Sequence, residues 1–194
     1  MSTQGSLPGF EPDQPTDRFF LAIFPDAHHA ARLATLADGF LGKHGLGAGA
    51  VAASRLHVTL FHLGDYAGQP PGLVEHAGQA LSRLVAEPFT IRFDQAGSFG
   101  NHRSKSPLVL AASEGNEALH ALHGQLAMHL RAHGLGQSTH GSFVPHMTVA
   151  YGKALLPFEA IEPISWPASE VRLVHSLLGK TRHIPLASRA LAGG

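Results

Sequence analysis

The sequence predicts an α+β fold made of two similar lobes, each of which supplies one strand to a central cleft. Segments of strand length alternate with segments of helical periodicity, but strands also follow one another directly, which fits α+β better than a doubly wound parallel sheet. The pattern histidine, apolar, threonine, apolar, apolar occurs twice, at His57 and at His146, each time on an expected strand. The length of 194 residues suits one domain or two closely packed lobes.

The N-terminal half is expected to alternate two strands with two helices. Residues 18–24 form a short apolar and aromatic segment that is typical of a buried strand. Asp26 suits the N-cap of a helix that runs to about residue 43, where Ala and Leu recur on one stripe. Residues 56–63 alternate as a strand does, and two prolines open a second helix over residues 70–87.

The C-terminal half is expected to contain five strands and one helix. A loop over residues 97–106 joins the first two of these strands, and Gly179-Lys180 joins the last two as a hairpin. The strands are expected at 89–93, 107–111, 144–151, 171–178 and 183–186, and the helix at 114–133.

Composition and charge limit the possible functions. The chain has no cysteine, which excludes disulfides, zinc–thiolate sites and a cysteine nucleophile. A net charge of zero argues against binding of long duplex DNA, because such binding needs many contacts from Lys and Arg to phosphates. Residues 1–17 resemble neither a signal peptide nor a membrane span, so they are expected to be a disordered tail before one domain over 18–194 in a cytoplasmic protein.

The two histidine motifs suit chemistry at a phosphodiester. Residues i and i+2 of a strand face the same side, so His57 points with Thr59, and His146 points with Thr148. Displacement at phosphorus needs one group that takes a proton and another that gives one, and two imidazoles can do both near neutral pH. The threonine hydroxyls can donate hydrogen bonds to the phosphate oxygens. This mechanism needs no metal and no cofactor.

Four segments carry a resemblance to a known family. RFFLAIFPD, LHVTLFHLGD, FVPHMTVAYG and VHSLLGKTRHIPL resemble, in this order, the landmarks of the 2H phosphoesterases, and in particular the LigT-like RNA 2′,3′-cyclic phosphodiesterases, also called the 2′-5′ RNA ligase family. The resemblance implies a bilobal fold with two antiparallel sheets related by a pseudo-twofold axis. It also implies hydrolysis of 2′,3′-cyclic phosphate ends of RNA to 2′-phosphates, with 2′-5′ ligation in the reverse direction in some members.

The resemblance also implies roles for the motif residues. His57 corresponds to the proton donor and His146 to the proton acceptor, while Thr59 and Thr148 correspond to the hydroxyls that hold the phosphate. Many relatives carry arginine three residues after the second motif threonine, where this chain has Tyr151. The cationic residues that could replace that arginine are Lys153, Lys180 and Arg182.

Two neighbours of the first motif have open or excluded roles. Phe61 shares its parity with His57 and Thr59, so it either walls the cleft and stacks on a base or fills the core. His62 has the opposite parity and is left out of the expected site.

Other functions remain open at this point. The same chemistry could act on a 2′-5′ oligonucleotide or a small cyclic nucleotide, or the chain could be a non-catalytic RNA- or nucleotide-binding module. A histidine-rich helix could hold a metal, but no carboxylate accompanies it at ligand spacing except Glu117, so a solvated face is the preferred interpretation. Its histidines are His120, His123, His129 and His133. The expected partners are RNA termini or small cyclic nucleotides, with no membrane and no protein partner implied.

Overall fold

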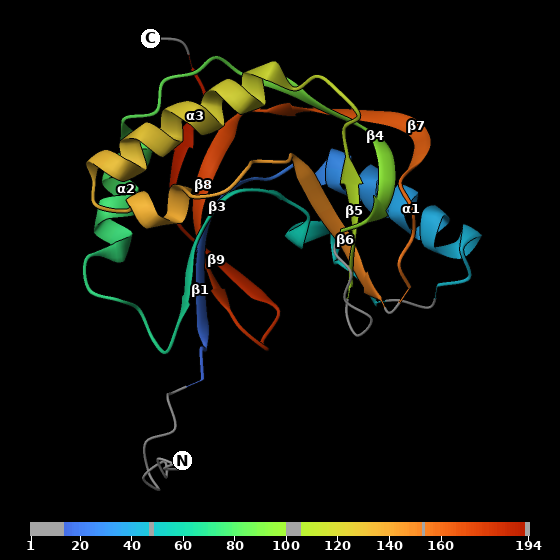
Figure 1. Cartoon of the computed structure of the whole chain (residues 1–194), viewed down its shortest axis with the longest axis horizontal. Coiled ribbons are helices and arrows are strands. Elements are labelled where there is room, and N and C mark those ends of the chain that lie inside the picture. The colour runs from blue at the N-terminus through green and yellow to red at the C-terminus, as the bar shows by residue number, and fades with distance from the viewer. Residues whose placement is uncertain (1–13, 47–48, 100–105, 153, 193–194) are drawn as a thin grey trace, which may run out of the picture.

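The computed structural model describes residues 14–46, 49–99, 106–152 and 154–192, and shows strands and helices arranged as two lobes around an open centre (Figure 1). The strands are β1 (Asp17–Ile23), β2 (Gly49–Ala50), β3 (Val58–Tyr66), β4 (Phe89–Ser98), β5 (Ser106–Ala111), β6 (His146–Gly152), β7 (Glu159–Ala168), β8 (Glu170–Leu177) and β9 (Arg182–Ala190). The helices are α1 (Ala27–Lys43), α2 (Leu73–Ser82) and α3 (Glu117–Ala132), with short 3₁₀ turns η1 (Ala53–Arg55) and η2 (Gly136–Thr139).

The strands form one antiparallel sheet that consists of two four-stranded halves. The order is β7-β4-β5-β6-β3-β1-β8-β9, and β2 adds to β6. One residue pair, Val58 with Met147, joins β3 of one half to β6 of the other. Each half runs outward from this junction through strands in matching positions, which agrees with the expected α+β fold of two related lobes.

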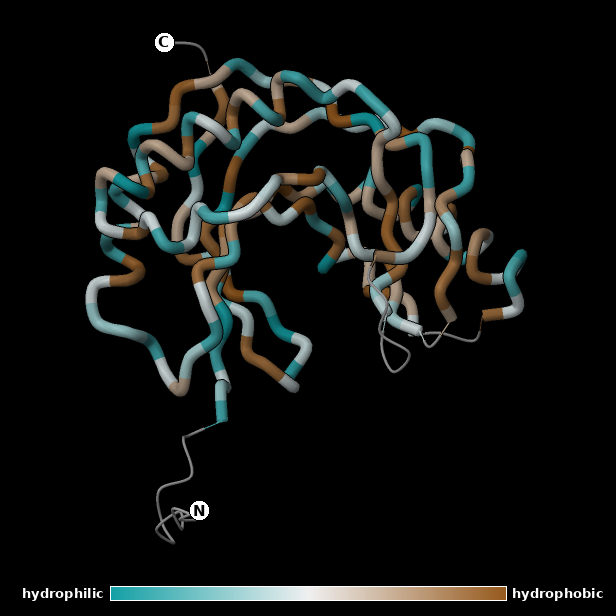
Figure 2. The backbone as a smooth tube through the Cα atoms, viewed as in Figure 1, coloured by the Kyte–Doolittle hydropathy of each residue, from teal (hydrophilic) through white to brown (hydrophobic). Residues whose placement is uncertain are grey.

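The helices cover the sheet on the side away from the open centre. Asp26 caps α1 by accepting a hydrogen bond from the backbone N–H of His29 at 2.8 Å, as its position before an amphipathic segment predicts. α1 packs against β2 and β6, whereas α2 packs against α3, β8 and β9. Figure 2 shows apolar stretches along the strands of both lobes. The helices therefore bury one face of the sheet and leave the other face open between the lobes.

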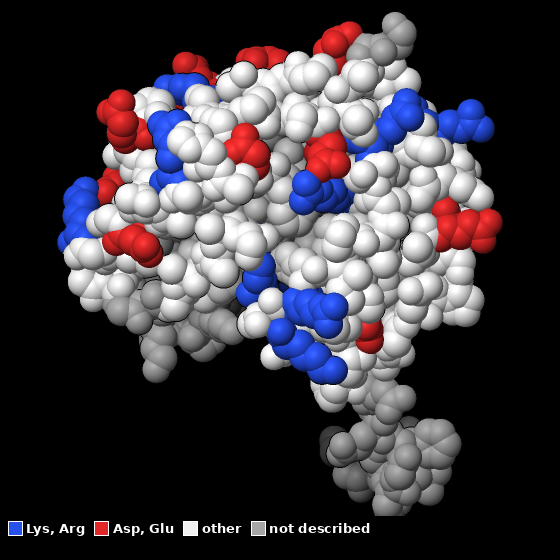
Figure 3. All heavy atoms as spheres, turned by 180° about the vertical axis from the view of Figure 1, so that it is seen from behind, with Lys and Arg blue, Asp and Glu red and all other residues white. Residues whose placement is uncertain are grey.

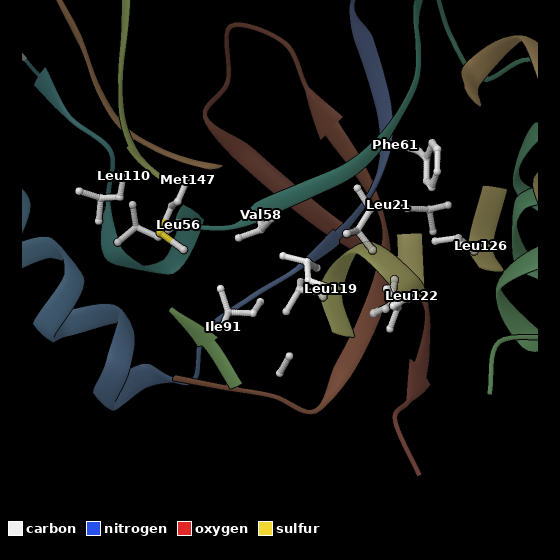
Figure 4. Close-up of a cluster of buried hydrophobic side chains, with 14 of the residues drawn as sticks. Leu21, Leu56, Val58, Phe61, Ile91, Leu110, Leu119, Leu122, Leu126 and Met147 are labelled. Carbon is white, nitrogen blue, oxygen red and sulfur yellow. The ribbon is translucent and has the colours of Figure 1, made fainter. Parts of the chain in front are cut away.

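A single large hydrophobic cluster continues through both lobes. Val58 and Met147 are both 0% exposed and point into this cluster, together with Leu119 and Leu122 of α3 (Figure 4). Since neighbouring residues of a strand face opposite sides, burial of Val58 and Met147 turns the residues beside them toward the other face. The motif histidines lie next to these two anchors.

Two strands are absent from the sequence-based expectation, the two-residue β2 and the longer β7. β7 contains Pro163 and Pro167, and proline argues against a strand because it cannot donate a hydrogen bond to the ladder. The structure resolves this conflict by placing β7 at the edge of the sheet, where it pairs with β4 alone. An edge strand needs hydrogen bonds on one side only, so it tolerates both prolines.

Several expected boundaries move by a few residues. Asp17, expected in the N-terminal tail, is the first residue of β1, because it pairs with Tyr66 of β3 and with Leu177 of β8. Residues 1–13 of the expected tail lie outside the described residues. α2 is shorter than predicted and spans Leu73–Ser82. None of the helices in the described ranges is long and apolar enough to cross a membrane.

Candidate active site

A cleft lies between the two lobes on the open side of the sheet. It encloses about 380 Å³ between β1, β3, β8, β9 and the β8–β9 turn of one lobe and β6 of the other. Its lining includes five of the sequence-predicted residues, namely both motif histidines, both motif threonines and Tyr151. The full lining is Arg18, Phe20, Arg55, His57, Thr59, His62, His146, Thr148, Tyr151, Ser176, Leu177, Leu178, Gly179, Thr181 and His183.

The junction between the lobes explains why the two motifs meet. Val58 pairs with Met147 in antiparallel register, and each of these residues directly follows a motif histidine. Continuing that register places His57 opposite Thr148, and Thr59 opposite His146. This register sets each histidine beside the threonine of the other motif, and both imidazoles and both hydroxyls line the same cleft.

The ring of His57 is held by a backbone carbonyl and by aromatic neighbours. Its Nδ1 donates a hydrogen bond to the carbonyl oxygen of Arg55 at 2.6 Å, which leaves Nε2 without that proton and free to act. The ring lies 4.9 Å from that of Phe20 and 5.2 Å from that of Phe24. Burial among these rings, together with the charges of Arg55 and His146, lowers the pKa of His57 from 6.5 to about 4.

His146 is held by the same backbone arrangement in a different setting. Its Nδ1 donates to the carbonyl oxygen of Val144 at 2.8 Å, again two residues earlier in the chain. Its aromatic neighbour is Phe99, whose ring lies edge-on at 5.0 Å. Since a carbonyl can only accept, both histidines carry the proton on Nδ1 when neutral and use Nε2 for chemistry.

His183 is a third histidine of the cleft that the sequence reasoning missed. Its ring lies edge-on to that of His57 at 5.4 Å and to that of Phe20 at 5.3 Å. Its Nδ1 is buried and has no hydrogen-bond partner among the described residues. Burial first, and then the charges of His57 and Arg55, lower the pKa of His183 to about 4. The sequence places it on a strand of the terminal hairpin, but nothing local indicates that this hairpin faces the motif strand.

A bulge in β3 reverses the expected parity of Phe61 and His62. Ala22 pairs with Thr59 while Leu21 pairs with Phe61, so Leu60 is an extra residue in the ladder. Phe61 consequently turns into the core, where it is 4% exposed and stacks on His123 of α3 at 4.2 Å. Phe61 therefore belongs to the hydrophobic core and is not among the described residues that line this cleft. His62, which strict alternation excluded, lines the cleft.

Two histidines of the expected histidine-rich helix, His123 of α3 and His133 just after it, are held by packing or by a hydrogen bond. His123 lies between the rings of Phe61 and Phe143, at 4.2 Å and 4.0 Å, and its pKa is lowered, mainly by burial. His133 hydrogen-bonds through Nδ1 to the carbonyl oxygen of His129 at 2.8 Å. Within the part of the chain that the structure describes, no three His, Asp or Glu side chains gather as metal ligands would.

Two arginines contribute positive charge to the cleft in different ways. Arg18 forms a two-pronged ion pair with Asp65, with Nε–Oδ1 and Nη2–Oδ2 distances of 2.7 and 2.6 Å, and this pairing lowers the pKa of Asp65 to about 2. His62 also bonds to Asp65, at 2.8 Å. Arg55 has no ion pair with any residue in the described ranges. No Asp or Glu is among the described residues that line the cleft.

The cations that were expected to replace the family arginine are not among the described residues that line the cleft. Lys153 is outside the described residues, and neither Lys180 nor Arg182 lines the cleft, although Gly179 and Thr181 beside them do. Lys and Arg side chains gather low in the middle of the face shown in Figure 3, with few acidic side chains beside them. The described cationic residues that line the cleft are Arg18 of β1 and Arg55 of η1, both of which the sequence reasoning overlooked.

Comparisons with known proteins identify the family. E. coli LigT complexed with 3′-AMP is 26% identical, covers 92% of this chain and 99% of its own, and has a TM-score of 0.66. TT0787 of Thermus thermophilus is 25% identical over 91% of this chain and 98% of its own, with a TM-score of 0.70. A comparison with curated protein sequences found no match. The profile of the 2′-5′ RNA ligase superfamily matches residues 24–180, and this chain belongs to that superfamily.

Proposed function

We propose that this protein hydrolyses 2′,3′-cyclic phosphate ends of RNA to 2′-phosphates, without a metal, using His57 and His146. One observation carries the proposal. Both imidazoles donate from Nδ1 to a backbone carbonyl two residues earlier, and both line one cleft together with Thr59 and Thr148. Two oriented imidazoles beside two hydroxyls form the minimum set of groups for acid–base displacement at phosphorus.

The reaction follows from this arrangement. One histidine accepts a proton from water as the water oxygen bonds to phosphorus, and the bond from phosphorus to the 3′ oxygen breaks. The other histidine gives its proton to the departing 3′ oxygen, which leaves a 3′-hydroxyl and a 2′-phosphate. Thr59 and Thr148 donate hydrogen bonds to the non-bridging oxygens as negative charge builds on them. If a 5′-hydroxyl takes the place of water, its oxygen bonds to phosphorus as the bond to the 3′ oxygen breaks, and the product is a 2′-5′ phosphodiester with a free 3′-hydroxyl, so 2′-5′ ligation uses the same residues.

The environment of His57 constrains the division of roles. A pKa of about 4 keeps this imidazole neutral at pH 7 in the ligand-free protein, which is the form that accepts a proton. The family resemblance assigns His57 the donor role instead. An anionic phosphate beside the ring favours the imidazolium, because the two opposite charges attract. The donor role is therefore consistent with the structure only when substrate is bound, and the substrate itself supplies the required charge.

The size and chemistry of the cleft support a nucleotide end as the substrate. A volume of about 380 Å³ lies in the usual range for small-molecule sites. E. coli LigT, which shares the fold, was crystallised with 3′-AMP, an adenosine carrying one phosphate. A cleft whose described lining has histidines, threonines and arginines but no carboxylate suits one such phosphate.

Turnover of a panel of substrates in excess EDTA tests the proposal. The panel contains 2′,3′-cyclic mononucleotides, oligoribonucleotides with a cyclic end, a 2′-5′ oligonucleotide and a 3′,5′-cyclic nucleotide. We expect hydrolysis of the cyclic ends to 2′-phosphates at a rate that EDTA does not change. Turnover of the 2′-5′ oligonucleotide or the 3′,5′-cyclic nucleotide alone would show that the protein uses the same chemistry on a substrate other than 2′,3′-cyclic ends. Tight binding of RNA without turnover of any substrate would favour a binding module and contradict the proposal.

A further inference from the structure

Arg55 differs from Arg18, the other arginine of the cleft, in having no ion-pair partner in the part of the chain that the structure describes. It is the last residue of η1, two residues before His57, and its side chain lines the cleft. Its Nε is buried and has no hydrogen-bond partner among the described residues. Arg18, by contrast, is already neutralised by Asp65 through two hydrogen bonds. Arg55 therefore retains both an uncompensated charge and an unused donor.

An unpaired guanidinium with a buried nitrogen is costly for a protein unless something binds to it. A donor that is removed from water and left unsatisfied costs roughly 1–3 kcal/mol, and more where the group is charged. No Asp or Glu is among the described residues that line the cleft, so no carboxylate there offsets the charge of Arg55. An anion that enters the cleft would satisfy both the charge and the donor.

The position of Arg55 places its charge beside the reacting groups. Arg55 lines the same cleft as His57 and His183, and its positive charge is among the causes that lower the pKa of both imidazoles. Its backbone carbonyl also accepts the Nδ1–H of His57 at 2.6 Å. One residue therefore fixes the orientation of the imidazole through its main chain and presents a cation next to it through its side chain.

We propose that Arg55 binds the phosphate of the substrate and supplies the positive charge that Tyr151 does not provide. This inference rests on the proposed function and names the residue that recognises the anion. Guanidinium groups match the geometry of phosphate oxygens and can donate two parallel hydrogen bonds to them. Bound phosphate neutralises Arg55 and attracts a proton to His57, so phosphate binding and protonation of His57 reinforce one another.

The test uses the full-length protein with two neutral variants at this position. Arg55→Gln keeps polarity, and Arg55→Met keeps the apolar stem, so that packing is preserved in at least one of them. Arg55→Lys keeps the charge but loses the fork of the guanidinium. Arg83→Gln, at an exposed arginine that does not line the cleft, is the matched control for loss of one positive charge. Thermal melting establishes which variants are folded.

Two readouts distinguish failure of this inference from failure of the proposed function. The first is the affinity for inorganic phosphate, measured by the shift of the His57 ring signals in NMR, which requires no turnover. The second is kcat/KM on a cyclic-ended oligoribonucleotide. We expect the neutral variants to lose about 10- to 100-fold in both, Arg55→Lys to lose less, and Arg83→Gln to match the wild type.

Each outcome has a defined consequence. Wild-type phosphate affinity and wild-type kcat/KM in a folded neutral variant would overturn the role of Arg55 while leaving the proposed function intact. If the wild-type protein binds phosphate through Arg55 but turns over no cyclic end, the anion site stands and the proposed function fails. The ligand-free neutral variants should also show a higher pKa for His57, because the neighbouring positive charge is gone, and an unchanged pKa would contradict the placement of the guanidinium beside the ring.

Discussion

The His57 side and the His146 side of the cleft share a backbone arrangement and differ in what surrounds the ring. In both, Nδ1 donates to the carbonyl oxygen two residues earlier, at 2.6 Å in one and 2.8 Å in the other. His57, however, lies against Phe20 and Phe24. His146 has Phe99 at its edge. The symmetric backbone thus presents two imidazoles in the same way to environments of different polarity.

The residues two positions before each histidine differ as well. The carbonyl that holds His57 belongs to Arg55, whose side chain lines the cleft, and the one that holds His146 belongs to Val144, whose side chain is 50% exposed. Arg55 and Val144 both orient a motif histidine through the backbone carbonyl, but only Arg55 adds a charged side chain. Two similar lobes can therefore divide acid and base roles through the neighbours of the motif, without any change in the motif itself.

Removal of either histidine is expected to have the largest effect. General acid–base steps contribute about 10² to 10⁴-fold each, so His57→Ala and His146→Ala should each lower kcat by that order. Steady-state rates on a cyclic-ended oligoribonucleotide measure this. Circular dichroism is the necessary control for His57→Ala in particular, because that ring packs against Phe20 and Phe24. Wild-type turnover by the double variant would remove both histidines from the mechanism.

Burial of His57 should also make the free energy of unfolding depend on pH. His57 has a lower pKa in the folded protein than the 6.5 of an unperturbed imidazole, so the unfolded chain takes up the proton first as pH falls. The free energy of unfolding should therefore decline between about pH 6.5 and pH 4, by up to about 3 kcal/mol from this residue, and be fully present above that range. Urea unfolding at pH 7 and pH 4.5 measures it. His57→Gln should flatten the dependence, and an equal slope in that variant would contradict burial as its cause.

Variants of Thr59 and Thr148 test whether both hydroxyls contact the phosphate, as the strand register at the junction of the two lobes predicts. Thr59→Val and Thr148→Val keep the shape of the side chain and remove the hydroxyl. Each removes one hydrogen bond to the phosphate, which we expect to cost about tenfold in kcat. Because each threonine lies opposite the histidine of the other motif, the two losses should be similar. Comparison of the single and double variants measures this, and a tenfold or greater difference between the two single losses would show that only one hydroxyl reaches the phosphate.

Tyr151 should show the smallest effect. It lines the cleft at the position where many relatives carry arginine, and 45% of its side chain is exposed. If Arg55 is the cation for the phosphate, Tyr151→Phe should lower kcat/KM by a smaller factor than Arg55→Gln does under the same conditions. A larger loss for Tyr151→Phe than for Arg55→Gln would contradict this order and would indicate that the tyrosine hydroxyl binds the phosphate in place of the arginine of the relatives.

The sequence predicted the elements that follow simple periodicity and failed where tertiary pairing overrides it. The alternation in β3 correctly placed Thr59 on the side opposite to Val58, because that stretch is regular. Beyond Thr59 the bulge at Leu60 exchanges the faces of Phe61 and His62, and no local residue pattern marks the bulge. β7 was not predicted, because its prolines argue against a strand in general. The sequence does not indicate that this strand lies at the edge of the sheet, where proline is tolerated.

The repeated motif predicted four residues of the cleft lining, whereas the residues that join them from other segments could not be predicted. His57, His146, Thr59 and Thr148 stand out because the pattern occurs twice, and the structure brings all four to one cleft. Arg55 and His183 join them from η1 and β9, whose positions beside the motif strand depend on long-range packing. A single arginine or histidine in such a segment carries no local signal of the surface that it faces.

The pH dependence of kcat/KM tests most directly whether two histidines in unlike environments share the reaction. The form with both imidazoles protonated has no base, and its formation requires protonation of His57, whose pKa is about 4 in the free protein. Because kcat/KM reports the free protein, its low-pH limb should fall near pH 4, with a second limb at higher pH where the pair loses its remaining proton. Initial rates between about pH 3.5 and 9, with circular dichroism at each pH, give the profile. A low-pH limb above about pH 6, or a rate independent of pH across this range, would contradict the account.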